Sequence, residues 1–147
     1  MIEFIHKTEK CEEVMTTLTL SWSRRIKSRQ RVMLDNTEDA GLFLERGVIL
    51  RGGDCLVSKE GIVIRVQAAE ETVSIVSCGN SLQLARVCYH LGNRHVALEI
   101  RELQVRYLHD HVLDGMLQGM GLTTKTIEAP FEPETGAYGE EHGHSHG

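Results

Sequence analysis

Eight histidines in a chain of 147 residues are the feature of this sequence with the clearest chemistry. Neutral imidazole is a common ligand for borderline transition metals, and nickel, copper and zinc all accept it. We assign no role to His6 and His90, which have no companion nearby in the sequence. The other six histidines form three groups that could bind a metal ion: His95; His109 with His111; and His142, His144 and His146.

His109 and His111 are two residues apart, a spacing that permits chelation in only one backbone conformation. Side chains at this spacing share a face of an extended segment but point about 200° apart on a helix. The pair can therefore bind one ion together only where the chain is extended. The alternative is that one histidine begins a helix while the other is solvated.

His95 stands alone in the sequence, so a metal site at this position needs ligands from elsewhere. A lone histidine is more often a hydrogen-bonded surface or core residue than a ligand. In a two-fold dimer, however, an interface at His95 would bring two copies of it together. Such a shared site would be shallow and able to release its metal.

The three tail histidines alternate with glycine or serine in the segment HGHSHG at residues 142–147. A flexible chain of this kind can wrap several imidazoles around one ion, and its binding would be weak and pH-sensitive. An expression tag is the alternative origin of such a segment. Tags are usually uninterrupted histidine runs, so the composition favours a native tail.

Charge and hydropathy exclude several other classes of protein. The chain has 21 acidic and 16 basic residues, and a net charge of -5 suits neither nucleic acid nor an anionic membrane surface. One local run, residues 24–31, holds five bases and no acid, and we expect a solvated strand face there rather than a nucleic-acid contact.

No apolar run approaches the ~20 residues that span a bilayer, and the N-terminus lacks the apolar core of a signal peptide, so we expect a cytoplasmic protein.

Neither the cysteines nor any short motif indicates an enzyme. Cys11, Cys55, Cys78 and Cys88 form no C-x-x-C pair, so we expect reduced, mostly buried thiols rather than a disulfide framework or a thiolate zinc site. The chain has no H-E-x-x-H, no G-x-S-x-G and no phosphate-binding glycine loop. These observations favour a binding or delivery protein.

Two regions with different patterns must position the histidines. Up to residue 70, short β-prone runs alternate with polar or glycine-containing turns, which predicts an all-β domain over residues 1–70. The expected strands cover residues 14–20, 30–34, 41–44, 47–50, 54–57 and 62–66.

From residue 71 onward, strands alternate with helical periodicity. We expect Ser81 to cap the first helix, Gly92 to end it, and Asp110 to lie near the start of the second. The resulting β-α-β-β-α-β order predicts a split-βαβ, ferredoxin-like domain over residues 71–130 and an α+β fold class. Residues 131–147 are acidic and glycine-rich, and we expect a disordered tail that contains histidine. The expected strands are 72–77, 96–100, 103–108 and 122–127, and the expected helices are 81–91 and 112–120.

Five segments of the chain together resemble the urease accessory nickel metallochaperones, the UreE family. GNRH alone would be a weak signal, but five segments in the same order span nearly the whole chain. They are RQR at 29–31, LERGVILRGGDCLV at 44–57, YHLGNRH at 89–95, HDHVLDGML at 109–117 and APFEPETGAYG at 129–139. The resemblance implies an N-terminal β domain similar to a peptide-binding fold, a ferredoxin-like metal-binding domain and a homodimer.

The resemblance also implies which histidines bind metal. The histidine of GNRH, here His95, binds nickel at the dimer interface together with its copy from the other protomer. The tail histidines, His142, His144 and His146, complete or extend that site. His109 and His111 match an additional peripheral site that accepts copper or nickel in some members.

We therefore expect a nickel metallochaperone that captures Ni(II) and hands it to apo-urease by way of the accessory GTPase, with no nucleic-acid or membrane partner. Exposed, labile imidazoles suit ligand exchange. Cu(II) and Zn(II) are alternative ions, because copper normally binds nitrogen sites more tightly than nickel does. Two rival hypotheses are a general divalent-metal buffer that uses the tail and His109/His111, and a peptide-binding scaffold in which metal is incidental.

Overall fold

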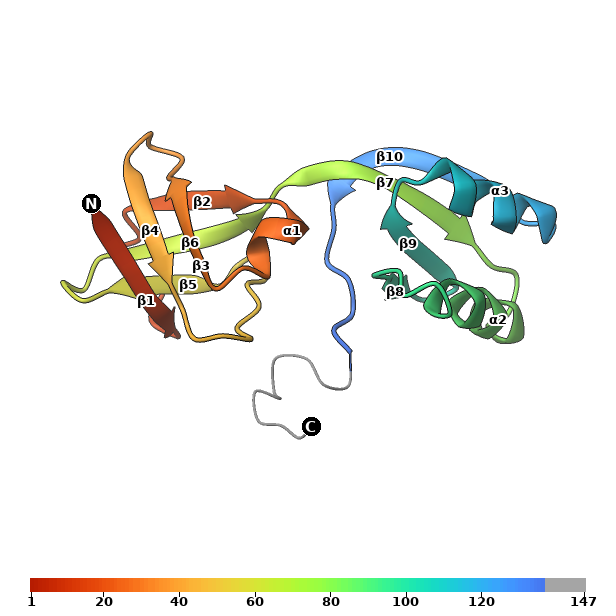
Figure 1. Cartoon of the computed structure of the whole chain (residues 1–147), viewed down its shortest axis with the longest axis horizontal. Helices are drawn as coiled ribbons and strands as arrows, with labels where there is room; N and C mark the ends of the chain where they lie inside the picture. Colours follow the sequence, from red (N-terminus) through yellow and green to blue (C-terminus); the bar gives the residue numbers. More distant parts are fainter. Residues whose placement is uncertain (137–147) are drawn as a thin grey trace. The chain divides into compact units, whose positions relative to one another are not determined.

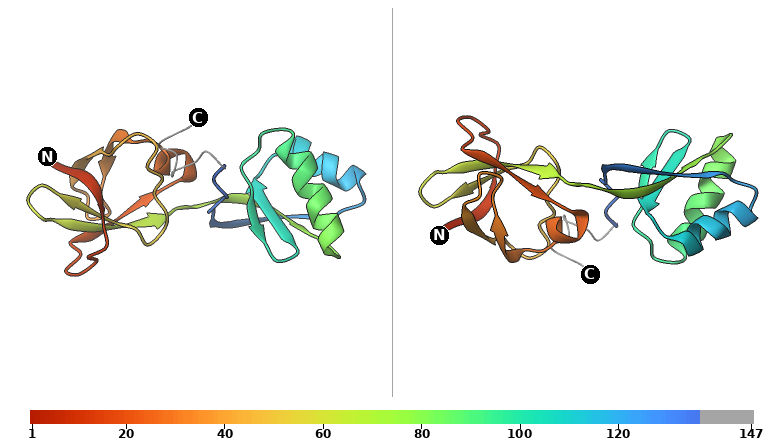
Figure 2. Two further views of the ribbon diagram at one scale, coloured as in Figure 1. Left: turned by 90° about the horizontal axis from the view of Figure 1, so that it is seen from below. Right: turned by 90° about the horizontal axis from the view of Figure 1, so that it is seen from above.

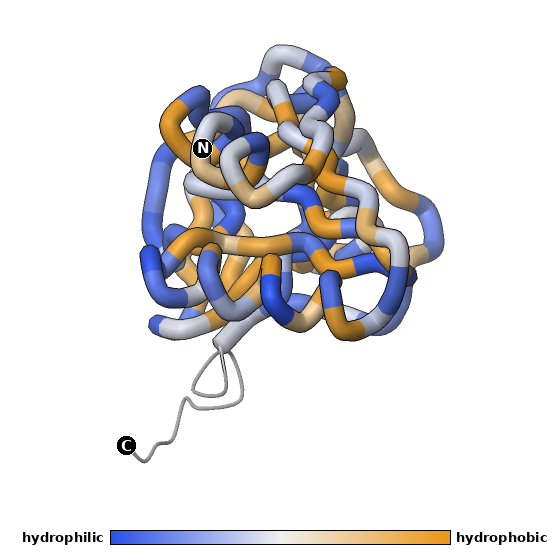
Figure 3. The backbone as a smooth tube through the Cα atoms, turned by 90° about the vertical axis from the view of Figure 1, so that its right-hand side faces the viewer, coloured by the Kyte–Doolittle hydropathy of each residue, from blue (hydrophilic) through white to orange (hydrophobic). Residues whose placement is uncertain are grey.

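The computed structural model describes residues 1–136, shown as a ribbon in Figure 1. These residues form two compact units, Met1–Ala69 and Glu70–Thr135. Hydrophobic and hydrophilic residues alternate at short intervals along the backbone (Figure 3), as strands with one buried face require. Within residues 1–136, no helix is long and apolar enough to cross a membrane.

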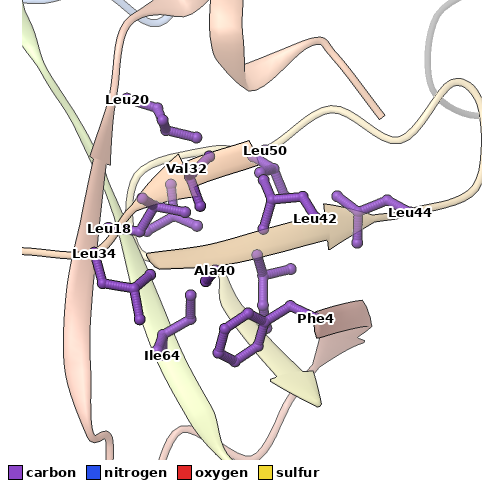
Figure 4. Packing of buried hydrophobic residues seen from close by; sticks show 12 residues of the cluster. Phe4, Leu18, Leu20, Val32, Leu34, Ala40, Leu42, Leu44, Leu50 and Ile64 are labelled. Atoms are coloured by element: carbon purple, nitrogen blue, oxygen red, sulfur yellow. The ribbon is translucent and has the colours of Figure 1, made fainter. Parts of the chain in front are cut away.

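The first unit is built on a six-stranded sheet with the order β2-β6-β5-β1-β4-β3. Strands β1 and β4, and strands β2 and β6, are parallel, whereas the other neighbouring pairs are antiparallel. Leu18, Leu42 and Phe4 come from three different strands and point toward one another in a single hydrophobic cluster (Figure 4). The elements are β1 (Ile2–Thr8), β2 (Thr16–Leu20), α1 (Trp22–Arg25), β3 (Arg29–Met33), β4 (Asp39–Phe43), β5 (Cys55–Ser58) and β6 (Val63–Ala68).

The first domain is mostly β, but three of its features differ from the expected list of strands. Strand β1 was not predicted, and the short helix α1 interrupts the strands. Residues 47–50 form no strand, because the amide of Val48 donates to Glu45 in a turn and the amide of Leu50 donates to the carbonyl of Arg25. This segment still contributes to the core, since Leu50 is fully buried.

The basic run 24–31 is likewise not one solvated strand face. Arg24 and Arg25 belong to α1, and β3 begins only at Arg29. The Arg25 side chain is fully buried; its guanidinium donates to the carbonyls of Leu20 and Leu50 and lies 5.3 Å from the ring centroid of Trp22. The helical turn at α1 carries Arg25 inward, and only the remaining bases of the run can be solvated.

The second unit is a four-stranded antiparallel sheet with the order β10-β7-β9-β8. Helices α2 and α3 lie on the same side of this sheet (Figure 2), and both pack into one hydrophobic cluster with it. Val87 and Leu91 of α2 and Leu117 of α3 are fully buried there. The elements are β7 (Glu70–Ser77), α2 (Ser81–Gly92), β8 (Glu99–Arg101), β9 (Gln104–Leu108), α3 (His111–Gly119) and β10 (Thr124–Pro130).

The caps of the two helices explain where each begins. Asn80, not Ser81 as expected, caps α2, and its side chain accepts a hydrogen bond from the amide of Gln83. Asp110 caps α3 by accepting from the amides of Val112 and Leu113 at 2.9 Å and 3.2 Å. Both side chains satisfy amides that have no partner inside the helix.

The segment after β10 is ordered further than the sequence suggested. Phe131 is fully buried, the amide of Glu132 donates to the Glu99 carboxylate at 2.9 Å, and the amide of Glu134 donates to the Leu98 carbonyl at 2.7 Å. The expected disorder is therefore wrong for residues 131–135, because Phe131 supplies apolar surface that the composition of the whole tail obscures. Residues 137–147, including His142, His144 and His146, lie outside the described residues.

The cysteines also depart from expectation. Cys11 and Cys55 form a disulfide, with Cα atoms 5.8 Å apart, so the expectation of reduced thiols was wrong for these two. Pairing of Thr8 with Cys55 at the end of β1 brings Cys11, just beyond β1, next to the start of β5. Cys78 and Cys88 are free, and burial raises the pKa of both thiols.

Candidate metal centre

His95 lies in the turn that follows α2 and is exposed to solvent. Its amide donates to the carbonyl of Gly92 at 3.0 Å, and its φ angle is +57°. Positive φ is uncommon for residues other than glycine, although histidine adopts it more readily than most. The turn therefore fixes the backbone of His95 just beyond the end of the helix and leaves its side chain exposed.

His109 follows directly after β9, and both its backbone and its side chain are held. Its amide donates to the carbonyl of Thr72 in β7 at 2.9 Å. Its ring nitrogen Nδ1 lies 3.1 Å from Ser74 Oγ and 3.3 Å from Asp114 Oδ2. The side chain remains 40% exposed, so the ring is anchored through Nδ1 while part of it faces solvent.

A buried polar network supports this arrangement of His109. Ser74 and Tyr107 are cross-strand partners on β7 and β9, and both are fully buried. The Tyr107 hydroxyl donates to Oδ1 of Asp114, whose other oxygen faces His109. Burial, together with the hydrogen bond to the Asp114 carboxylate, raises the pKa of Tyr107 well above its ordinary value.

A histidine that donates Nδ1–H to a carboxylate presents the lone pair of Nε2 to a metal ion. This carboxylate–histidine–metal arrangement fixes the tautomer and raises the basicity of the ligand. At His109 the hydrogen-bond partner of Nδ1 is Ser74 Oγ, and Asp114 is the neighbouring carboxylate that can take this role when the ring binds a metal ion. Neither Asp114 nor Ser74 was identified from the sequence, although Asp114 stands inside the HDHVLDGML segment.

His111 is exposed and is the first residue of α3. Asp110, between the two histidines, has an extended backbone with φ -154° and ψ 113°. The backbone between His109 and His111 is therefore extended, as chelation by both would require. His111 also begins the helix, as the alternative expected.

The described residues of one chain do not by themselves gather a complete metal site. Within residues 1–136, no group of three or more His, Cys, Asp or Glu side chains is arranged to hold a metal ion. His95 supplies one imidazole at the turn after α2, and His109 and His111 supply two at the start of α3. A metal ion at either position would need further ligands beyond these side chains.

Comparison with known proteins covers both units of the chain. The family model for the N-terminal domain of the UreE urease accessory protein matches residues 2–69, and that for its C-terminal domain matches residues 71–147. The urease accessory protein UreE of Pseudomonas putida strain W619 is 52% identical over 139 residues, which cover 94% of this chain and 86% of that protein.

Two further relatives carry the same name. The urease accessory protein UreE of Citrobacter koseri is 48% identical over 149 aligned positions, which cover 100% of this chain and 98% of the relative. That of Alcanivorax borkumensis is 53% identical over 136 residues, which cover 89% of this chain and 77% of the relative. The chain therefore belongs to the UreE family of urease accessory proteins.

Proposed function

We propose that this protein is a nickel metallochaperone that binds Ni(II) as a homodimer and delivers it to apo-urease during assembly of the urease active site. The family consists of accessory chaperones and not of enzymes. The observation that carries the nickel site is the exposed imidazole of His95, held at positive φ in the turn after α2. Nickel is the cargo of this site, which must bind it and then release it.

The paired His95 side chains of two protomers form the transfer site in this proposal. One exposed imidazole is a weak ligand, and a two-fold axis beside it doubles the number of ligands. His142, His144 and His146 then complete or extend the coordination. Because all these ligands are neutral imidazoles and not thiolates, the ion can leave by stepwise ligand exchange.

Exposed apolar side chains of the second unit support dimerisation there. Leu82 and Tyr89 on α2 are 59% and 65% exposed, and Val112 on α3 is 60% exposed. Leu82 and Tyr89 are seven residues apart, about two helical turns, so they lie on one exposed face of α2 that a second protomer would cover. The carbonyl of Tyr89 also accepts from the amide of Asn93, which ties Tyr89 to the turn that carries His95.

His109 and His111 form a separate, peripheral site in this proposal. Asp114 orients His109, and the extended backbone at Asp110 lets both imidazoles approach one ion. Copper and zinc accept the same ligands as nickel, so this site would take Cu(II) or Zn(II) as well.

The remaining assignments follow the same proposal. Residues 1–70 are a peptide-binding-like β domain, residues 71–130 are a ferredoxin-like metal-binding domain that the segment to residue 135 extends, and the rest forms the histidine-containing tail. The partners are the urease apoprotein and the urease accessory proteins, including the accessory GTPase, and the protein acts in the cytoplasm.

Urease activation in cells tests this function. We would supply the full chain, its His95→Ala variant or its His90→Ala variant to cells that express urease but lack this protein, at limiting nickel. His90 is the matched control, because it is an exposed histidine of α2 with no assigned role. We expect His95→Ala to lose most urease activation and His90→Ala to retain it.

Full activation by His95→Ala would contradict the proposal. If deletion of residues 142–147 then sensitised the cells to nickel or copper without affecting urease, a general divalent-metal buffer would be the better assignment. Nickel tolerance and urease activity must therefore be measured on the same cells.

A further inference from the structure

We propose that the first unit carries a docking surface for an acidic segment of a partner protein that also presents apolar side chains. We call it the Phe43 surface, and it consists of Ile26, Arg29, Arg31, Met33, Phe43 and Arg46. All six residues are exposed. The Phe43 surface contains none of the metal-binding histidines, so its function does not depend on the nickel assignment.

One edge of the Phe43 ring lies against Gly41 of its own strand. A Cβ atom placed on Gly41 would be 2.7 Å from Cε2 of Phe43, closer than real Cβ contacts come. Gly41 therefore provides the space for the ring, which remains 40% exposed. The exposed part of this ring forms an apolar platform on the outer face of the sheet.

Further apolar side chains extend this platform. Met33 on β3 is 61% exposed, and Ile26, between α1 and β3, is 46% exposed. Strand β3 lies at one end of the sheet order, and its Val32 faces the core while Arg29, Arg31 and Met33 face outward. The alternation of the strand thus delivers one apolar and two basic side chains to the same outer face.

Basic groups surround the platform. Across the β3–β4 pair, Arg29 is the partner of Phe43 and Arg31 is the partner of Gly41, and the Arg29 guanidinium lies 6.0 Å from the Phe43 ring centroid. A hollow of about 630 Å³ adjoins it, lined by Ile26, Lys27, Ser28, Arg29, Leu44, Glu45 and Arg46. Three of these lining residues are basic and one is acidic.

This combination favours a protein partner over a nucleic acid. Arginine mixed with exposed aromatic and methionine side chains is typical of protein interfaces, and complementary charge would select an acidic segment. Asp39, which lies 3.6 Å from Arg31, and Glu45 in the hollow offset part of the positive charge, which favours a partner that presents apolar side chains beside its acids over a uniformly charged phosphate backbone. Stacking of bases also needs several aromatic rings, and Phe43 is the single aromatic residue of the Phe43 surface.

The test uses the full chain and a fluorescein-labelled peptide of alternating glutamate and phenylalanine, with binding measured by fluorescence anisotropy. The matched probes are a Lys/Phe peptide and a Glu/Ser peptide of the same length. We expect the Glu/Phe peptide to bind tightest, because it alone matches both the charge and the apolar groups of the Phe43 surface.

Four variants locate the binding. We expect Arg29→Glu with Arg31→Glu, Phe43→Ala, and Met33→Ala each to raise the Kd for the Glu/Phe peptide, by about tenfold for the first two. Gly41→Ala keeps every charge and the ring but displaces the ring from the backbone, so it should also weaken binding. The control, Arg86→Glu with Lys125→Glu, reverses two exposed charges on the second unit and should leave the Kd unchanged.

Three results would overturn the proposal. The first is that the Glu/Phe peptide fails to bind the wild-type chain. The second is an equal loss in the Arg86/Lys125 control, which would mean diffuse electrostatic attraction. The third is that single-stranded DNA binds more tightly than the Glu/Phe peptide and depends on Arg29 and Arg31, which would make the surface a nucleic-acid contact.

Circular dichroism checks the fold of each variant. Met33→Ala, at a highly exposed position, keeps the test valid if Phe43→Ala fails to fold.

Discussion

Asp114 holds His109 from the first turn of α3: its Oδ2 lies 3.3 Å from His109 Nδ1, while its Oδ1 accepts a hydrogen bond from Tyr107. One buried carboxylate thus links a fully buried tyrosine to a partly exposed imidazole. The orientation of the His109 ring is therefore set by residues of the core as well as by its own position in the sequence.

Replacing Asp114 with asparagine should weaken metal binding at His109 and His111. The carboxamide keeps the shape but removes the charge that orients the ring, and losses of about 10- to 100-fold are typical when such a partner is lost. Titration of the full chain with CuCl2 and NiCl2 by calorimetry measures this, with Glu102→Gln as an exposed control. Unchanged affinity for the peripheral ion would show that Asp114 serves only the fold.

Tyr107 should contribute to stability at neutral pH and lose that contribution in alkali. Its pKa is raised in the folded protein, so the folded state holds the proton more tightly than the unfolded chain. The stabilisation is complete below the ordinary tyrosine pKa of about 10 and is lost as the pH rises from there toward the folded-state pKa.

Chemical denaturation of the wild type and Tyr107→Phe tests this sign. Near neutral pH the variant should be less stable by about 1–3 kcal/mol, because Asp114 loses a buried donor. The difference between the two proteins should shrink above about pH 10. A difference that grows with pH would contradict the assigned direction.

Opening the Cys11–Cys55 disulfide should destabilise the first unit. The bond closes a loop with a sequence separation of 44 residues, and disulfides of this kind contribute typically about 2–4 kcal/mol. Cys11→Ser with Cys55→Ser should lower the Tm, whereas Cys88→Ser, at a free cysteine, should have little effect on the melting of this unit.

Thiol counting with Ellman's reagent checks the bond itself. Under denaturing conditions, protein purified without reductant should show only Cys78 and Cys88, and all four cysteines should react after reduction. Four reactive thiols before reduction would show that the pair is not bonded. Protein taken from reducing cytoplasm and trapped with a thiol reagent would report its state in the cell.

The cap of α3 should link helix stability to metal binding. Asp110→Ala removes the acceptor for the amides of Val112 and Leu113, at a cost of about 1 kcal/mol, and loosens the extended link between His109 and His111. Asp110→Asn is the matched control, because asparagine caps helices equally well. Equal stability of the alanine and asparagine variants would contradict the capping role.

Helical periodicity placed the second unit well, because apolar spacing is a local property. The helices expected at 81–91 and 112–120 are found at Ser81–Gly92 and His111–Gly119. Residues 47–50 look like a strand in isolation, yet their amides bond to a turn and to Arg25, a partner that the sequence does not reveal. The segment after β10 is a second case that local sequence does not reveal. Its acidic, glycine-rich composition predicts disorder, yet Phe131 is fully buried.

The candidate ligands could be chosen from the sequence, but their surroundings could not. Spacing drew attention to His109 and His111, whereas His95 was chosen because the GNRH segment resembles the UreE family. The contact between His109 and Asp114 depends on how β9 turns into α3, and the positive φ of His95 depends on the turn after α2. The Cys11–Cys55 bond joins residues far apart in the chain and depends on the pairing of β1 with β5.

The most direct test of the nickel site is calorimetry with NiCl2 on the chain ended at residue 141, with and without His95→Ala. Sedimentation gives the oligomeric state, and His90→Ala serves as the control. We predict one tightly bound ion per dimer, which His95→Ala abolishes and His90→Ala preserves. Tight binding that survives His95→Ala, or that appears only when residues 142–147 are restored, would contradict a shared site built on His95.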